Sequence, residues 1–478
     1  MTTRGTPRVI KGLLVCVALI ALAGCAAIEP QKGFDEIKRS VNDRVGQQVY
    51  WKTGGPEDQQ VAKRVKMLLQ GRMHLDEVIQ VALLNNPDLQ AIYEDLGIAQ
   101  ASLVQAGLLS NPVFSGALRF VGGGESPTLD IDVSQDFLNI LTLPIRKKLA
   151  YLEFEAAKLR VTGAVIDLAA DVRRAYYNAQ ANEQAVEMMR QVVAATGAML
   201  TSARKLHEAG NINDLALDRQ QAIHEEARLL LADVETALML DRERLNSLMG
   251  LWGNDVVWTM SARLPDLPAE YLTTQDFEKR VIEKNLDLAT TRLTIEGLTK
   301  RLGLVKATSF IPDLELGYSG EREDGVWGNG PAISLQIPIF DMGQAKRFRV
   351  VSALRKAQWQ YMARAIELRA MSRSAAIDLR QSRAKVDHLL KVLLPLRQRI
   401  LDGAMLEFNA MQMGVFRLLE DQRRQIETGR DYISALQEYW LSRANLEQLL
   451  SGRQAGSSLG RDGKTTLQMD MGEDNRGH

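Results

Sequence analysis

The stretch LLNNPDL at residues 83–89 recurs as IEKNLDL at residues 282–288, which lies 199 positions further along the chain. Three more matched pairs follow in the same order: SNPVF at 110–114 with FIPDL at 310–314, GNINDL at 210–215 with GVFRLL at 414–419, and LMG at 248–250 with LSG at 450–452. Each pair is a weak match by itself, but four pairs at nearly constant offset predict a tandem duplication. The larger offset of the third pair predicts a slightly longer helix in the second repeat.

Each repeat is expected to open with a helix, at residues 75–109 and again at residues 274–308. In the first repeat, Asn86-Pro87 predicts a break, because proline suits a first helical turn and disfavours helix just before it. In the second repeat, Thr273 is the expected helix cap.

Two pairs of short segments alternate apolar and polar side chains with a period of two, which predicts strands. In the first repeat the strands are 113–121 and 128–136, joined by a loop at Gly122 to Gly124. In the second repeat they are 313–320 and 331–340, joined by a glycine-rich loop at 325–330. Each repeat is therefore predicted to hold one β-hairpin, within residues 111–138 and 312–340.

Residues 144–250 and 343–452 are each expected to form a pair of long helices, and Pro395 interrupts the second pair. At 1.5 Å per residue, a helix over 144–209 would span roughly 100 Å. A helix of this length needs neighbours along its whole surface, as in a coiled coil. The apolar stripe expected to face those neighbours comprises Val165, Leu168, Ala169, Val172, Tyr176 and Ala179.

The N-terminus has the pattern of a secretory signal peptide, with basic residues before an apolar run at 12–22 that is too short to remain as a membrane span. The following LAGC, at residues 22–25, resembles the bacterial lipobox, which implies cleavage before Cys25 and acylation of that residue. Ala26 fits onward sorting to the outer membrane. The alternative is an ordinary signal peptide with a chance cysteine. The only other cysteine is Cys16, which leaves with the signal peptide, so the mature chain can form no internal disulfide.

The predicted fold is mainly α with a small β part. Its expected divisions are a signal peptide at 1–24, an N-terminal segment of undetermined structure at 25–72, repeat 1 at 73–250, a linker at 251–271, repeat 2 at 272–452 and a disordered tail at 453–478.

The predicted strands carry one apolar face and one acidic face, and two structures could accommodate them. One is a small sheet packed on helices, and the other is a transmembrane barrel with the apolar face toward lipid. Four strands cannot close a barrel, so several copies must contribute, and three copies would supply twelve strands. Physics alone also allows two or four copies. In a barrel, the residues lining the lumen are expected to be Asp130, Asp132, Asp313 and Glu315, which would favour cations.

Residues 74–89 resemble the opening signature of the TolC-like outer-membrane efflux family, and IPIFDMG at 337–343 is similar to the family's segment after its last strand. Gly210 and Gly414 resemble the two periplasmic hairpin tips of that family. The resemblance implies a homotrimer in outer-membrane lipid, with a twelve-stranded β-barrel on an α-helical barrel. It also implies two partners, a periplasmic adaptor (membrane fusion) protein and an inner-membrane transporter.

The same resemblance implies roles for residues at the tips. The expected adaptor-binding residues are Gly210, Asn211, Ile212, Gly414, Val415 and Phe416. The family's constriction carries acidic side chains on the return helix, so the gate candidates are Asp214, Asp218, Glu420 and Asp421. An ordinary solvated helix face explains these four acids equally well, and the first repeat has Ala216 where the second has Glu420.

No enzyme chemistry is indicated: the five histidines form no HExxH spacing, and we expect no catalytic residues, metal site or cofactor. The formal net charge of zero gives no reason to expect nucleic-acid binding. A periplasmic coiled-coil scaffold or adaptor lipoprotein without a pore is the main alternative function. The sequence does not identify the exported substrate, the pump or the adaptor.

Overall fold

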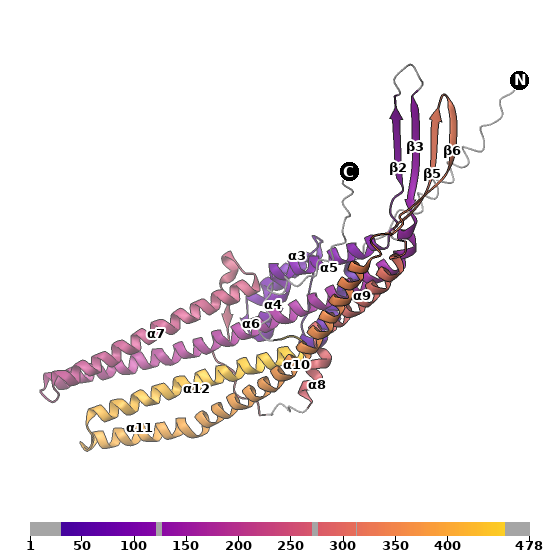
Figure 1. The fold of residues 1–478 in the computed structure, drawn as a ribbon. Coiled ribbons are helices and arrows are strands. Elements are labelled where there is room, and N and C mark those ends of the chain that lie inside the picture. The colour runs from indigo at the N-terminus through magenta and orange to yellow at the C-terminus, as the bar shows by residue number, and fades with distance from the viewer. Residues whose placement is uncertain (1–29, 121–126, 270–275, 312, 455–478) are drawn as a thin grey trace. The chain divides into compact units, whose positions relative to one another are not determined.

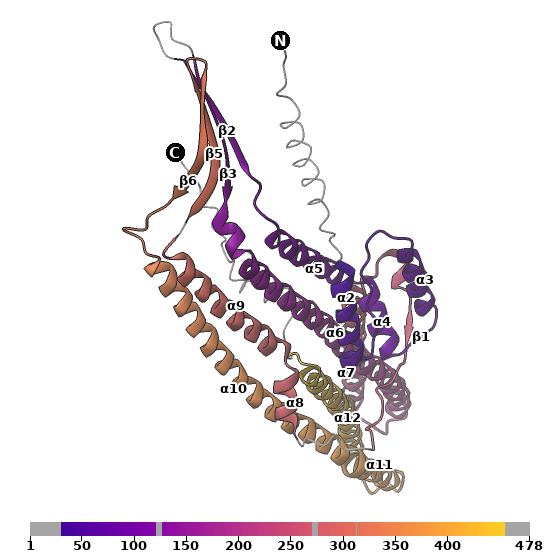
Figure 2. The ribbon, with the colours of Figure 1, turned by 90° about the vertical axis from the view of Figure 1, so that its right-hand side faces the viewer.

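The computed structural model describes residues 30–120, 127–269, 276–311 and 313–454 (Figures 1 and 2). The chain divides into two compact units. The sheet unit holds residues 95–158 and 293–357 with the N-terminal residues up to Asp35, and the helical unit holds the remainder. The proposed signal peptide, Cys25 and residues 455–478 lie outside the described residues.

The sheet unit contains one antiparallel sheet, built from a hairpin of each repeat (Figure 1). Its strand order is β2-β3-β5-β6, with β2 at Val113–Arg119, β3 at Thr128–Asp136, β5 at Leu314–Glu323 and β6 at Val326–Leu335. The prediction of one hairpin in each repeat is therefore confirmed. The loop between β2 and β3, including Gly122 to Gly124, lies outside the described residues.

The second hairpin corrects the sequence analysis at its turn. Residues 326–330 were expected in a loop, but they form the first half of β6, and residues 336–340 lie beyond the strand. The chain reverses instead at Asp324-Gly325, whose φ angles are +49° and +82°. Both positive angles fit a two-residue hairpin turn, for which Asp-Gly is a favoured pair. Because β6 is an edge strand, it tolerates the glycines and Pro331 that suggested a loop.

The opening helix of each repeat is broken in two. In the first repeat α4 (Leu75–Asn85) and α5 (Pro87–Ala106) meet at Asn86, as predicted. In the second repeat α8 (Phe277–Lys284) and α9 (Leu286–Thr308) meet at Asn285, where no proline signals a break. The expected cap Thr273 lies outside the described residues.

Long helices make up most of the described chain. In the first repeat α6 (Phe137–Glu208) runs for 72 residues and includes Pro144, so it begins earlier than predicted, and α7 (Asp214–Met249) returns beside it. In the second repeat α10 (Gln344–His388), a π-helical turn η2 (Leu389–Leu393) and α11 (Leu394–Asn409) are followed by the return helix α12 (Val415–Leu450). The π-turn ends two residues before Pro395, which confirms an interruption of the regular helix there. The six residues predicted as the apolar stripe of the first long helix are all buried.

The described residues before and between the repeats form helices and short strands. The N-terminal segment forms α2 (Pro30–Val45) and α3 (Glu57–Leu69). The predicted linker contains a short 3₁₀ helix, η1 (Gly253–Val256), and a strand, β4 (Thr259–Met260), that pairs in parallel with β1 (Arg72–Met73). Among the described residues, no helix combines the length and the apolar character needed to cross a membrane.

Candidate functional site

The strand register divides the four-stranded sheet into an apolar face and an acidic face. Residues paired across neighbouring strands share a face, and so do alternate residues of one strand. The apolar face carries Phe114, Leu118, Leu129, Ile131, Val133, Leu316, Tyr318, Trp327, Ile333 and Leu335. The opposite face carries Asp130, Asp132, Asp136, Glu315, Glu321 and Glu323, with Arg119 as a basic residue among them.

The apolar face is largely uncovered. Ile333 is 72% exposed, and Phe114, Val133 and Leu335 are also exposed rather than packed against helices of the same chain. A contiguous exposed apolar surface of this kind normally marks a site of contact with another protein or with lipid. The alternative of a small sheet packed on its own helices is therefore not what the structure shows.

The acidic face places like charges directly opposite one another. Asp130 lies opposite Glu321, and Asp136 lies opposite Glu315, an arrangement that destabilises a sheet unless cations or water compensate it. Arg119 pairs with Asp130, and the Asp136 carboxylate accepts a 2.8 Å hydrogen bond from the backbone N–H of Asn139.

Of the four acids predicted for this face, three occupy it within the strands. Asp130, Asp132 and Glu315 lie in β3 and β5, whereas Asp313 stands just before β5. Sequence reasoning missed Asp136, and it missed Glu323 together with Glu321. Continuing the period-two pattern to the end of each strand would have found all three.

The tip of the first helix pair is a tight turn built on Gly210. Its φ is +77°, and its backbone N–H donates to His207 O at 2.8 Å, while Asn211 N–H donates to Leu206 O at 2.8 Å. These two bonds are the Schellman pattern that ends many helices, in which glycine adopts the left-handed conformation. The return helix then starts after Asn213, whose side chain accepts a hydrogen bond from Ala216 N–H.

The tip of the second helix pair has the same bonds but a different residue at the centre. Met411, with φ of +59°, donates its N–H to Phe408 O, and Gln412 N–H donates to Glu407 O, both at 2.9 Å. Gly414 is the residue before α12 and has an ordinary φ of −78°. Met411 is therefore the structural counterpart of Gly210, at an offset of 201, and the predicted pairing of Gly210 with Gly414 is wrong. The longer helix expected in the second repeat is reduced to one extra residue, because buried positions before the π-turn, such as Val186 and Val386, correspond at an offset of 200.

With an offset of 201 between the two tips, the gate candidates of the two repeats lie at non-equivalent positions. The counterparts of Asp214 and Asp218 in the second repeat are Val415 and Leu419, and the counterpart of Glu420 is Arg219. Equivalent positions of the two tips therefore do not carry matching acids.

The gate candidates also have local partners. Asp214 lies 2.7 Å from His207 Nε2, and Glu420 accepts a 2.9 Å hydrogen bond from Arg424 Nε within its own helix. Asp218 is exposed and Asp421 is half-buried.

Buried asparagines join each opening helix to the end of its return helix. Asn86 Nδ2 donates to Leu248 O at 2.9 Å, and its Oδ1 accepts from Leu89 N–H at 2.9 Å. Asn285 repeats this arrangement with Gly452 O at 3.3 Å and Leu288 N–H at 2.8 Å. Each asparagine thus caps its opening helix and also holds the end of the return helix against it, a contact that we call a clasp. This double role explains why the NPDL and NLDL segments recur.

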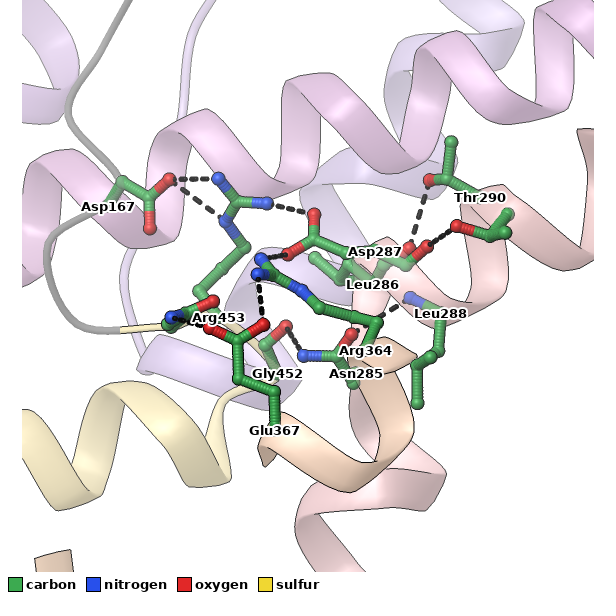
Figure 3. Close-up of polar contacts among 12 residues, drawn as sticks. Asp167, Asn285, Leu286, Asp287, Leu288, Thr290, Arg364, Glu367, Gly452 and Arg453 are labelled. Carbon is green, nitrogen blue, oxygen red and sulfur yellow. Dashed lines mark hydrogen bonds and ion pairs between the residues drawn. The ribbon is translucent and has the colours of Figure 1, made fainter. Parts of the chain in front are cut away.

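A charged network surrounds the second clasp, and Figure 3 shows its geometry. The Arg453 guanidinium contacts the nearly buried Asp167 of α6, with Nη2 at 2.6 Å and Nε at 2.9 Å from Oδ2, and also pairs with Asp287 of α9. Arg364 of α10 lies 3.2 Å from Asp287 and 3.1 Å from Glu367. The network ties α6, α9 and α10 to the residue that follows α12, and it shows that Arg453 is not part of a disordered tail.

A pair of very long helices occurs twice in the chain, and the hairpins of the two repeats share one sheet with an apolar and an acidic face. Residues 78–251 match the model of the family described as outer membrane efflux protein. This match supports the resemblance to the TolC-like family that residues 74–89 carry.

Individual proteins are similar to this chain over most of its length. The cobalt-zinc-cadmium resistance protein CzcC of Cupriavidus metallidurans is 23% identical over 394 residues, which are 80% of this chain and 90% of CzcC. A membrane protein from Pseudomonas aeruginosa has a similar fold, with a TM-score of 0.68 and 16% identity over 79% of this chain and 92% of that one. The outer membrane protein VceC of Vibrio cholerae gives 0.65 and 15% over 80% and 96%.

Proposed function

We propose that this chain is the lipid-anchored outer-membrane channel of a tripartite efflux system, and that three copies form a conduit through which substrates pass passively to the exterior. The observation that carries the proposal is the sheet, which has an exposed apolar face, an acidic opposite face and, among the described strands, no partner for the outer edges of β2 and β6. An open sheet edge cannot remain in hydrocarbon, because its backbone groups would lack hydrogen bonds. Three copies close twelve strands into a ring, with the acidic face toward water.

The long helix pairs continue the conduit into the periplasm in this proposal. Three copies bring six pairs, enough for a second, helical tube. The tips then meet the adaptor through Gly210, Asn211, Ile212, Gly414, Val415 and Phe416, to which the structure adds the exposed Met411. Acylation of Cys25 supplies a reversible membrane anchor, and the barrel supplies the permanent one.

Cationic cargo fits the acidic face best. Asp130, Asp132, Asp136, Glu315 and Glu321 would place a strongly negative lining in the lumen, which raises the local concentration of cations. The relative CzcC is described as a cobalt-zinc-cadmium resistance protein, which supports divalent metal cations as the cargo class here.

Planar-bilayer recording of the purified protein under a KCl gradient tests the proposal. We expect stepwise conductance with a reversal potential that shows cation preference. Replacing three acids together, Asp130→Asn, Asp132→Asn and Glu315→Gln, should reduce the preference while the steps persist. Glu57→Gln, at an exposed position of α3 outside the sheet and the long helix pairs, is the matched control and should leave the preference unchanged. Absence of conductance from protein that is folded and inserted would favour the poreless scaffold instead, and anion preference would refute the acidic lining.

A further inference from the structure

A cavity of about 290 Å³ lies where α2, α6, α8 and α12 meet, and all of its lining residues belong to the helical unit. Its size is close to the lower end of the range of about 300–1,000 Å³ that is usual for small-molecule sites. The charged residues of its lining are Asp43 and Arg44 at the end of α2, Arg173 of α6, Arg280 and Lys284 of α8, and Glu447 of α12. Four basic and two acidic side chains leave the lining with a net charge of +2.

The two basic residues of α8 have no acidic partner. Arg280 and Lys284 are four residues apart, so their side chains lie on one face of the helix. Both are exposed, and the side chain of neither forms an ion pair or a hydrogen bond with any residue that the structure describes. They therefore bring two uncompensated positive charges to the cavity.

Arg44 is held by neutral acceptors. Its Nη1 donates to Lys284 O at 2.9 Å and to Ser451 O at 2.7 Å. Backbone carbonyls satisfy these hydrogen bonds without supplying a full negative charge. Burial lowers the pKa of Arg44, and the neighbouring carboxylate of Asp43 offsets that effect in part. A further anion close to the guanidinium would stabilise its charged form.

Arg173 is paired with an acid that it shares. One carboxylate oxygen of Glu447 contacts Arg173, and the other lies 2.9 Å from Arg443 Nε. The Nε of Arg173 is buried and has no hydrogen-bond partner within the described part of the chain. Because one carboxylate serves two guanidinium groups, this wall of the cavity also carries more positive than negative charge.

We propose that the cavity binds a phosphate group, either of a soluble phosphate or of a lipid headgroup. Guanidinium groups bind phosphate through two parallel hydrogen bonds, and a lysine adds a point charge. A phosphate monoester carries about two negative charges near neutral pH, which matches the net charge of the lining. The bound group would hold α8 of the second repeat against α2 and α6 and would reduce the repulsion among the four cations. This inference concerns the helical unit alone and does not rest on the proposed function.

Isothermal titration calorimetry on the full-length protein in dodecyl maltoside, an uncharged detergent, tests the site. The probes are inorganic phosphate, glycerol 3-phosphate and dihexanoyl phosphatidylglycerol, each titrated at constant ionic strength with chloride as the competing anion. We expect saturable binding at one site in each chain. Binding of the first two probes would identify a soluble phosphate as the ligand, and binding of phosphatidylglycerol alone would identify a lipid headgroup. If none of the three bound, the inference would be wrong.

Two matched pairs of substitutions locate the binding. Arg280→Gln combined with Lys284→Gln should weaken binding by about tenfold or more, because a single hydrogen bond between charged groups is commonly worth that factor. Lys63→Gln combined with Lys66→Gln removes the same charge from exposed positions of α3 and should leave the affinity unchanged.

Circular dichroism of each variant shows that it is folded. Lys284→Gln alone should give an intermediate affinity, and this single variant keeps the test decisive if the double variant does not fold. Equal affinities of the α8 variants and the parent, or an equal loss in the α3 variant, would overturn the inference.

Discussion

Replacing Met411 with glycine should stabilise the tip of the second helix pair. Met411 holds a left-handed φ of +59°, and its side chain is 95% exposed, so few contacts would be lost. The left-handed conformation costs a residue with a Cβ about 1–2 kcal/mol. Glycine avoids that cost but loses about 0.5–1 kcal/mol more conformational entropy on folding. The net gain is then about 0.5–1 kcal/mol, which corresponds to roughly a two- to five-fold reduction in local opening.

Native-state hydrogen exchange, read by mass spectrometry on peptides that cover residues 404–416, measures this opening. Gly210→Met is the reciprocal variant and should increase opening of the first tip by a similar factor, because Gly210 has a φ of +77°. Gly414→Ala is the matched control: its φ is negative and its surroundings are open, so no strain is introduced. If Gly414→Ala increased opening while Met411→Gly did not reduce it, Gly414 would be the turn glycine after all, and the offset of 201 would be wrong.

Four further single variants and one double variant test the clasps and the charged network by urea denaturation followed with circular dichroism. Arg453→Met should cost about 3–5 kcal/mol because it leaves the carboxylate of Asp167 buried without its main partner, and adding Asp167→Leu should recover most of the loss. Asn285→Ala should cost about 1–2 kcal/mol through loss of the helix cap, and Asn86→Ala, as its counterpart, should cost the same within error. Gly452→Ala should also destabilise the folded state, since a Cβ there would stand 2.2 Å from Lys284 O in a backbone with φ of +98°. Unchanged stability of this variant would argue against the second clasp.

The features that the sequence predicted well are periodic and local. Leu129, Ile131 and Val133 share one face of β3 because a strand turns its side chains with a period of two whatever it pairs with. The apolar stripe of α6, from Val165 to Ala179, could also be predicted from the sequence, because a buried helix face repeats every three to four residues. The duplication reinforced both patterns by presenting each of them twice.

The features that the sequence did not predict depend on conformation or on distant partners. Gly414 was matched to Gly210 by residue identity, but a left-handed turn requires a backbone conformation that Met411 also adopts. Arg453 read as the start of a polar tail, because its partner Asp167 lies 286 residues earlier in the chain. The break at Asn285 had no proline to signal it, and its role appears only when Gly452 is brought against it.

The π-turn at Leu389–Leu393 explains how the repeats differ in length without losing their common faces. An insertion of one residue in an α-helix would rotate everything beyond it by about 100° and turn the buried face away from its neighbour. A π-turn takes up the extra residue within a single wide turn, so the helix continues in phase on both sides. Pro395 lies two residues beyond this turn. It has no N–H to donate to the carbonyl of the fourth residue before it, and a locally widened helix tolerates that missing hydrogen bond better than a regular helix does. The same turn therefore takes up the extra residue, and Met411 precedes the first residue of α12 by four positions, as Gly210 precedes that of α7.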